Sequence, residues 1–220
     1  MVMTKFQKVQ YFLQVVCTIA TVIFLLLLFP TLIDSFKLDF WAAIGAFFIG
    51  ILAADLASGI FHWGADTWGK QTWPIVGPAI LKSFRDHHKT PLGILEHDFF
   101  ETNGDACFGL VPLLVIALLM GISGPVAVGV FTFSLAILLT NQAHKYAHMA
   151  RPPVVIRFLQ KSRILLVRND HQRHHTPPYV KSYCITTGWL NPMLNTLNFW
   201  RLLERAVTKV TGAIPREDEH

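Results

Sequence analysis

Charged side chains are scarce in this sequence. Asp, Glu, Lys and Arg make up only 15% of the 220 residues, whereas 52% of the residues are hydrophobic. A chain of this length is expected to form one domain or at most two. Its mean hydropathy of +0.42 exceeds that of ordinary soluble domains. Because most of the apolar residues fall in a few long runs, the composition predicts a membrane protein.

Cysteine is nearly absent as well. The three cysteines, Cys17, Cys107 and Cys184, are scattered along the chain and never form a C-x-x-C pair. Their distribution excludes a disulfide framework and a zinc ribbon, and it predicts reduced thiols. Internal repeats, heptads and low-complexity segments are also missing. These absences leave a single domain over residues 1–220 as the expected organisation.

The sequence also lacks a basic stripe with interleaved aromatic residues, the pattern typical of nucleic-acid-binding proteins. The net charge is nevertheless +5 and the isoelectric point is near 9.2. Anionic lipid headgroups explain this basic excess at least as well as a nucleic acid does. We therefore predict a membrane partner and no nucleic-acid partner.

Four apolar runs are long enough to cross a bilayer as helices. The first follows two lysines, as a secretory signal would, but about 23 residues is too long for a signal core and no small-x-small cleavage site follows. The third and fourth runs flank the turn GISGP and are near the short end of the spanning range. The sequence predicts an all-α integral membrane protein with four spans, at about residues 11–33, 40–62, 106–122 and 125–143, and with polar segments at 64–105 and 144–220.

Lysine and arginine are unevenly distributed between the two ends of these spans. Four spans put both termini on the same side of the membrane. The loops of the opposite side, around 31–39 and 121–125, contain Lys37 and no arginine, and nearly all other basic residues flank the helices on the side of the termini. By the positive-inside rule, we expect the termini and both polar segments to be cytosolic.

Histidine is concentrated in the same part of the molecule. The chain has ten histidines, and all except His220 fall at the cytosolic end of a predicted span or in a polar segment. Residues three or four apart share one face of a helix, so each such pair is a candidate pair of metal ligands. The pairs are His62 with Asp66, His144 with His148, and His171 with His174 or His175.

His87 and His88 are adjacent, so on a helix they would diverge by about 100° and serve different metals or roles. Imidazole suits zinc, copper, iron and nickel. A single zinc ion takes about four ligands, and neither H-E-x-x-H nor a set of thiolates is present. Eight or nine imidazoles fit two metals with four to five ligands each and leave room for dioxygen, which favours two irons.

Alternatives remain for these histidines. A lone histidine at a membrane surface is more often a hydrogen-bonding group than a ligand. A bis-histidine haem carrier would place paired histidines within the membrane, and a metal transporter would place its ligands near the midplane on broken helices. The histidines of this chain have neither distribution.

Two acidic residues are candidate partners of the histidines. Asp55 lies within the second apolar run, where a carboxylate is costly and usually functional. It precedes His62 by seven residues and is expected to accept the second N–H of that imidazole. The alternative for Asp55 is a pair with a lysine at a helix end. Asp66 is expected to be a ligand or an orienting group, with a solvated helix-end acid as the alternative.

Five long motifs extend across the polar segments: GIFHWGADTWG (59–69), WPIVGPAILKSFRDHHKTP (73–91), EHDFFETNGD (96–105), QAHKYAHM (142–149) and HQRHHTPPYVKSYCITTGWLNPML (171–194). In this order, over about residues 50–217, they resemble the Kua/CarF family of lipid desaturases. The likeness before residue 50 is only a generic hydrophobic one.

The resemblance implies a fold like that of membrane fatty-acid desaturases, with a cytosolic histidine-rich helical cap. It implies a non-haem diiron enzyme that uses dioxygen and two electrons from an external donor. His171, His174 and His175 reproduce the family's H-x-x-H-H box. The resemblance places His62, Asp66, His171 and His175 at the catalytic centre. The implied iron ligands are His62, His87, His88, His97, His144, His148, His171, His174 and His175.

The resemblance also implies a substrate. The motif YCITTGWLN is similar to the corresponding motif of one branch of the family. That branch forms the vinyl ether (1-alkenyl) bond of plasmalogens from plasmanylethanolamine. The alternative is the related branch that introduces a trans double bond into an acyl chain of phosphatidylglycerol.

Cytochrome b5 or a ferredoxin is the expected electron donor, docked on the basic surface. The expected membrane is the bacterial inner membrane or the endoplasmic reticulum. The segment from Tyr183 to Arg205 is expected either to lie at the membrane interface or to pack as an ordinary part of the cap.

Overall fold

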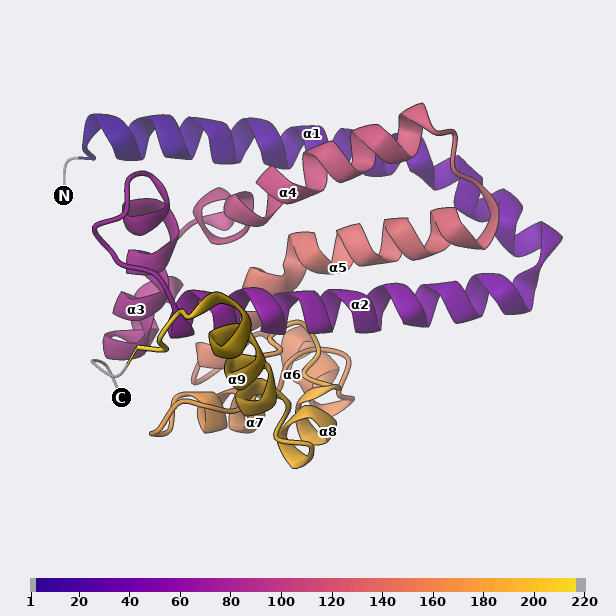
Figure 1. Cartoon of the computed structure of the whole chain (residues 1–220). Coiled ribbons are helices and arrows are strands. Elements are labelled where there is room, and N and C mark those ends of the chain that lie inside the picture. The colour runs from indigo at the N-terminus through magenta and orange to yellow at the C-terminus, as the bar shows by residue number, and fades with distance from the viewer. Residues whose placement is uncertain (1–2, 217–220) are drawn as a thin grey trace. The chain divides into compact units, whose positions relative to one another are not determined.

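A computed structural model describes residues 3–216, and every regular element in that range is a helix (Figure 1). The elements in chain order are α1 (Lys5–Leu38), α2 (Phe40–Thr67), the π-helix η1 (Gly77–Leu81), α3 (Lys82–Lys89), the 3-10 helix η2 (Pro91–Leu95), α4 (Phe99–Leu119), α5 (Gly124–His148), α6 (Val154–Lys161), α7 (Arg168–His174), α8 (Asn191–Thr196) and α9 (Phe199–Thr211).

Four of these helices, α1, α2, α4 and α5, are long and apolar enough to cross a membrane. The four predicted spans are confirmed as helices, and the protein is a membrane protein. The third span needs a correction: α4 ends at Leu119, three residues before the expected end, because the chain turns at Gly121 with a positive φ of 58°. It also begins earlier, at Phe99, because Asp98 and Glu101 form a capping box there.

The chain forms two compact units, Met1–Ala54 with His97–Gln142, and Asp55–Glu96 with Ala143–His220. Each unit combines two separate stretches of sequence, and the helices α2 and α5 each continue from one unit into the other. The single domain over residues 1–220 therefore stays a prediction.

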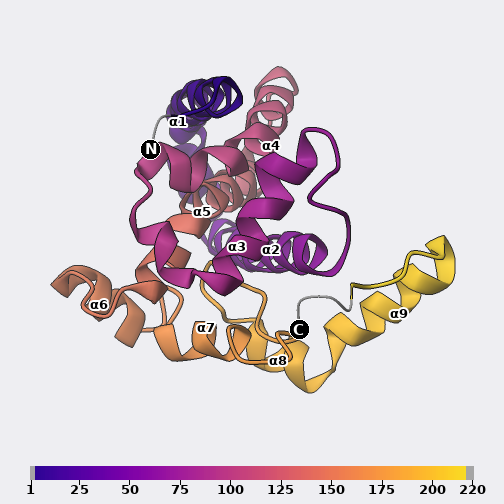
Figure 2. The same cartoon turned by 90° about the vertical axis from the view of Figure 1, so that its left-hand side faces the viewer.

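The first unit contains α1 and α4, which run alongside each other (Figures 1 and 2). Gln14 on α1 donates to Asp105 on α4 over 2.8 Å. The backbones approach closely here, since a Cβ added to Gly104 would lie only 2.4 Å from that of Gln14. Small residues allow such close packing of helices in membranes. Gly50 likewise lets α2 and α5 pack closely, because a Cβ added to it would lie only 2.0 Å from the hydroxyl oxygen of Thr132.

The second unit contains the ends of α2 and α5 and the short helices α3 and α6 to α9, of which α7, α8 and α9 follow one another in Figure 2. Between α7 and α8 the chain is irregular. Asp55 on α2, which is fully buried, holds this irregular segment in place. Its carboxylate accepts hydrogen bonds from the backbone N–H groups of Thr187 and Gly188, both at 2.9 Å, and of Leu190 at 3.1 Å.

The expected contact of Asp55 with His62 is therefore wrong, and so is the alternative pair with a lysine. Both residues lie on one face of α2, as their spacing of seven requires, but the irregular segment packs along that face and its N–H groups contact both carboxylate oxygens. His62 instead contacts the carbonyl oxygen of Tyr183 in the same segment, with its Nδ1 at 3.3 Å. Asp55 thus supports His62 only indirectly.

We predict that Asp55→Ala strongly destabilises the protein. The substitution leaves three backbone N–H groups without an acceptor, and each costs about 1–3 kcal/mol when buried. For a chain of this size the apparent Tm in detergent should fall by roughly 6 °C or more.

Two variants calibrate the measurement of Tm for Asp55→Ala. Asp55→Asn keeps an acceptor for Thr187 and Gly188 and should lose less. Asp34→Ala removes a side chain that is 71% exposed and should leave Tm unchanged. An equal Tm for Asp55→Ala and Asp34→Ala would contradict the assigned role of Asp55.

Candidate metal centre

The histidines of the second unit gather into two groups of potential metal ligands. Within each group every residue offers one ligand atom, and these atoms lie within 4.8 Å of one another. The five-histidine group consists of His87, His144, His148, His171 and His175. The Asp66 group consists of His62, Asp66, His88 and His174.

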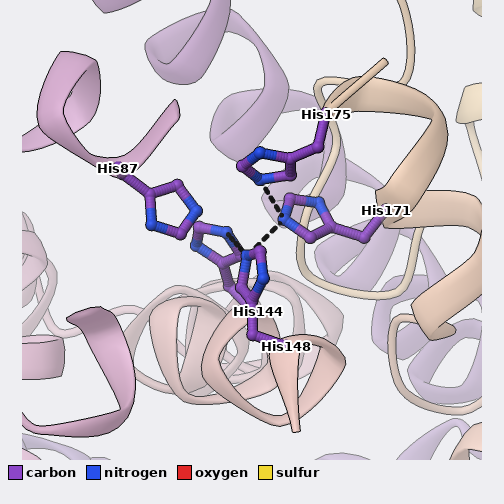
Figure 3. A group of neighbouring side chains, drawn as sticks. All are labelled: His87, His144, His148, His171 and His175. Atoms are coloured by element: carbon purple, nitrogen blue, oxygen red, sulfur yellow. Dashed lines mark hydrogen bonds between the residues drawn. The ribbon is translucent and has the colours of Figure 1, made fainter. Parts of the chain in front are cut away.

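The five-histidine group is built from α3, α5 and the end of α7, and its rings point toward one another (Figure 3). His144 and His148 lie one turn apart on α5, as their spacing predicts, with their Nε2 atoms 3.1 Å apart. The Nε2 atom of His171 lies 2.8 Å from that of His148 and 3.0 Å from that of His175.

The Asp66 group is built from α2, α3 and α7, around one carboxylate oxygen. The Oδ2 atom of Asp66 lies 3.1 Å from Nε2 of His88. It lies 3.4 Å from Nε2 of His62 and 3.4 Å from Nε2 of His174. Three imidazole nitrogens and one carboxylate oxygen thus converge from three helices. Of the two functional interpretations of Asp66, the geometry fits a ligand.

Adjacent histidines are divided between the two groups. On α3, His87 belongs to the five-histidine group and His88 to the Asp66 group, as the expected divergence of adjacent residues on a helix requires. At the end of α7, His175 and His174 are divided in the same way. The groups are neighbours, because the rings of His88 and His175 have their centroids 5.1 Å apart.

Two backbone carbonyl groups fix the orientation of ligands in the Asp66 group. Nδ1 of His174 lies 3.0 Å from the carbonyl oxygen of Lys181, and Nδ1 of His62 contacts that of Tyr183. A carbonyl oxygen only accepts, so each Nδ1 donates its proton. The lone pair of each imidazole is then on Nε2, the atom that faces Asp66. This is how proteins orient histidine ligands of metals.

Burial keeps three imidazoles of the five-histidine group neutral, those of His87, His171 and His175. Loss of solvent is the main cause that lowers the pKa of His87 and His171 far below the ordinary value, and it lowers the pKa of His175 to about 2. Neighbouring imidazoles lower these pKa values further. Because only a neutral imidazole binds a metal, the environment favours the ligand form.

The donor set fits two metal ions. Neutral Nε2 atoms at 2.8–3.1 Å from one another need a proton or a cation between them. Among the described residues, Nε2 of His87 and Oδ1 of Asp66 are buried without a hydrogen-bond partner. Buried polar atoms of this kind call for an explanation, and a bound ion is one of the usual ones. No cysteine in residues 3–216 belongs to either group, so the set consists of imidazoles and one carboxylate.

The ninth histidine implied by the resemblance, His97, is in neither group. It is exposed in the turn between η2 and α4. Its role as a ligand stays a prediction that rests on the resemblance alone.

Sequence reasoning missed the carbonyl groups of Lys181 and Tyr183, because a backbone acceptor leaves no signal in the residue type. It also missed Arg216, whose guanidinium donates to the carbonyl oxygen of Asp66 over 3.0 Å.

Comparison with known proteins agrees with this geometry. The family model described as the lipid desaturase domain matches residues 51–218, a range that contains every member of both groups. A plasmanylethanolamine desaturase of Myxococcus xanthus is 43% identical over 183 residues, which cover 81% of this chain and 65% of that protein. Plasmanylethanolamine desaturase 1 of Mus musculus is 43% identical over 180 residues, covering 77% of this chain and 66% of that protein.

A more distant relative is the chloroplastic fatty acid desaturase 4-like 1 of Arabidopsis thaliana. It is 36% identical over 174 residues, covering 77% of this chain and 58% of that protein. This chain thus spans 58–66% of the length of the relatives named here. No solved structure matches it. The match over most of the chain nevertheless establishes its kinship: the chain belongs to the lipid desaturase domain family.

Proposed function

We propose that this protein is a dioxygen-dependent diiron desaturase that forms the vinyl ether bond of plasmalogens from plasmanylethanolamine. The observation that carries the proposal is the pair of adjacent ligand groups, in a chain 43% identical to two plasmanylethanolamine desaturases. The fatty acid desaturase 4 branch is less similar, at 36% identity or below among the relatives compared. This difference favours the ether lipid as substrate.

In this proposal each ligand group holds one iron ion, and His62, Asp66, His171 and His175 belong to the catalytic centre. When bound, the two irons supply the activation of dioxygen, with two electrons from an external donor. The chain contributes the ligands and their orientation. Asp66 brings a negative charge to one group, and the carbonyl groups of Tyr183 and Lys181 fix the tautomers of His62 and His174.

The depth of the ligands in the membrane suits an ether lipid. His62 and His144 lie close to the ends of α2 and α5, where the apolar spans finish. The carbons to be desaturated lie next to the glycerol ether oxygen, and therefore at the boundary between headgroup and hydrocarbon. A lipid that stays in the bilayer thus offers these carbons at the level of the site, and holding the bond in register there is what a desaturase requires.

The excess of basic residues around the termini supports a cytosolic site, and with it the cytosolic orientation of both termini. A basic surface in water favours an acidic electron carrier, such as cytochrome b5 or a ferredoxin. The histidines that hold the irons lie in this same part of the chain, so electrons and lipid would arrive from different phases.

Expression in a host that makes plasmanyl but not plasmenyl lipids tests the reaction. Acid-labile vinyl ethers should appear with the intact protein, and mass spectrometry of the lipids measures them. His171→Ala and His175→Ala should reduce them to background, because each removes a ligand from the five-histidine group. Arg173→Ala, an exposed neighbour on α7, is the matched control and should retain the activity.

The lipids of the same host also distinguish the proposed reaction from the alternative reaction on phosphatidylglycerol. Altered acyl chains of phosphatidylglycerol, without vinyl ethers, would replace the proposed substrate by the alternative. Vinyl ethers formed equally well by His171→Ala and by the intact protein would contradict the assignment of the site.

Metal analysis of the purified protein tests the ligand groups independently of turnover. We expect two irons per chain, one for each group. His148→Ala should lower the content toward one iron, because it removes one of the five imidazoles. Arg173→Ala should retain both irons, since the exposed Arg173 belongs to neither group. An iron content of His148→Ala equal to that of the intact protein would contradict the assignment of the five-histidine group.

A further inference from the structure

We propose that the segment from Tyr183 to Leu197, which comprises the irregular chain before α8 and α8 itself, enters the hydrocarbon region of the membrane, deepest at Thr187–Leu190, and faces lipid acyl chains. From the sequence, the stretch from Tyr183 to Arg205 is expected either at the membrane interface or packed in the cytosolic cap. Three features of the structure support a position in the bilayer: its depth along α2, its hydrogen bonding and its exposed side chains. The inference rests on the membrane spans and is independent of the proposed reaction.

The depth follows from the geometry of α2. This helix is continuous from Phe40 to Thr67. At a rise of 1.5 Å per residue, Asp55 lies about 22 Å along the axis from Phe40. The hydrocarbon core is about 30 Å thick, so Asp55 falls inside it when the core begins near Phe40. Because Asp55 accepts hydrogen bonds from Thr187 to Leu190, these residues lie at the same depth.

The hydrogen bonding of the segment meets the condition that the hydrocarbon imposes. Irregular backbone is tolerated at membrane depth only where its polar groups are paired within the protein. Here buried or partly buried side chains provide the partners that a helix or a strand would otherwise supply. In addition to the Asp55 bonds, the pairs are Ile185 N–H with Ser58 Oγ (3.2 Å), Cys184 N–H with Asn191 Oδ1 (3.0 Å), Asn191 Nδ2 with the Cys184 carbonyl (2.8 Å) and Ser182 N–H with Asn195 Oδ1 (3.0 Å).

The exposed side chains of the segment are uncharged and mostly apolar, with Thr196 as the polar exception. No charged residue occurs between Lys181 and Arg201. Its exposed large side chains are Trp189 (37% exposed), Met193 (52%) and Leu197 (59%), spaced four residues apart. Exposed apolar groups at this spacing suit contact with lipid chains. On α7, by contrast, the exposed residues include the polar Gln172 and Arg173.

The acyl chains of the bilayer are therefore the occupant of this surface. The segment also supplies the carbonyl oxygen that orients His62, so a lipid-facing element is in direct contact with the Asp66 group.

Site-directed spin labelling of the full chain in proteoliposomes tests the proposal. Nitroxide labels at Trp189→Cys and Met193→Cys report collisions with dioxygen, which concentrates in hydrocarbon, and with a water-soluble nickel chelate. Leu52→Cys, one turn before Asp55 on α2, is the lipid reference, since Leu52 is 37% exposed. Lys82→Cys is the water reference, since the Lys82 side chain is 58% exposed.

We expect both test labels to match Leu52→Cys, with frequent collisions with dioxygen and few with the nickel chelate. Collision ratios that match Lys82→Cys, or that fall midway between the references, would overturn the proposal. The unsubstituted protein gives the background from its own thiols, of which Cys107 and Cys184 are buried. An unchanged metal content confirms that each labelled variant is folded.

The outcome is independent of the proposed reaction. Labels in lipid together with no vinyl ether product would leave the membrane-embedded segment standing and remove the proposed function. Vinyl ether product together with labels in water would leave the proposed function standing and remove the membrane-embedded segment.

Discussion

The hydrogen bonds of the buried Asp55 carboxylate connect a membrane-spanning helix to the chain that completes the metal centre. A carboxylate within an apolar span is costly unless its oxygens are paired, and three backbone N–H groups pair them here. The same bonds fix the irregular chain that includes Tyr183. Its carbonyl oxygen in turn orients His62. One buried polar contact on α2 thus helps to position the segment that orients a candidate metal ligand.

Much of this architecture could be predicted from the sequence, because local periodicity determines it. The long apolar runs identified the four spans, and the spacing of His144 and His148 placed both residues on one face of α5. The divergence of His87 from His88 is equally local. Each of these predictions needs only the geometry of a single helix.

The remaining features depend on contacts between elements that are distant in sequence. Asp55 and Leu190 are 135 residues apart, and no local pattern indicates that they meet. The division of His174 and His175 between two ligand groups required the positions of α2, α3 and α5 to be known.

The short helices α3 and α7 each provide ligands to both groups, and this has a consequence for the evolution of the family. Inserting or deleting one residue turns the rest of a helix by about 100°. In α7 such a change would separate His171 from His174 and His175, and would disturb both groups together. Substitutions at the intervening, exposed Gln172 and Arg173 do not alter this geometry. Between its ligands, α7 is therefore free to vary in residue type but fixed in length.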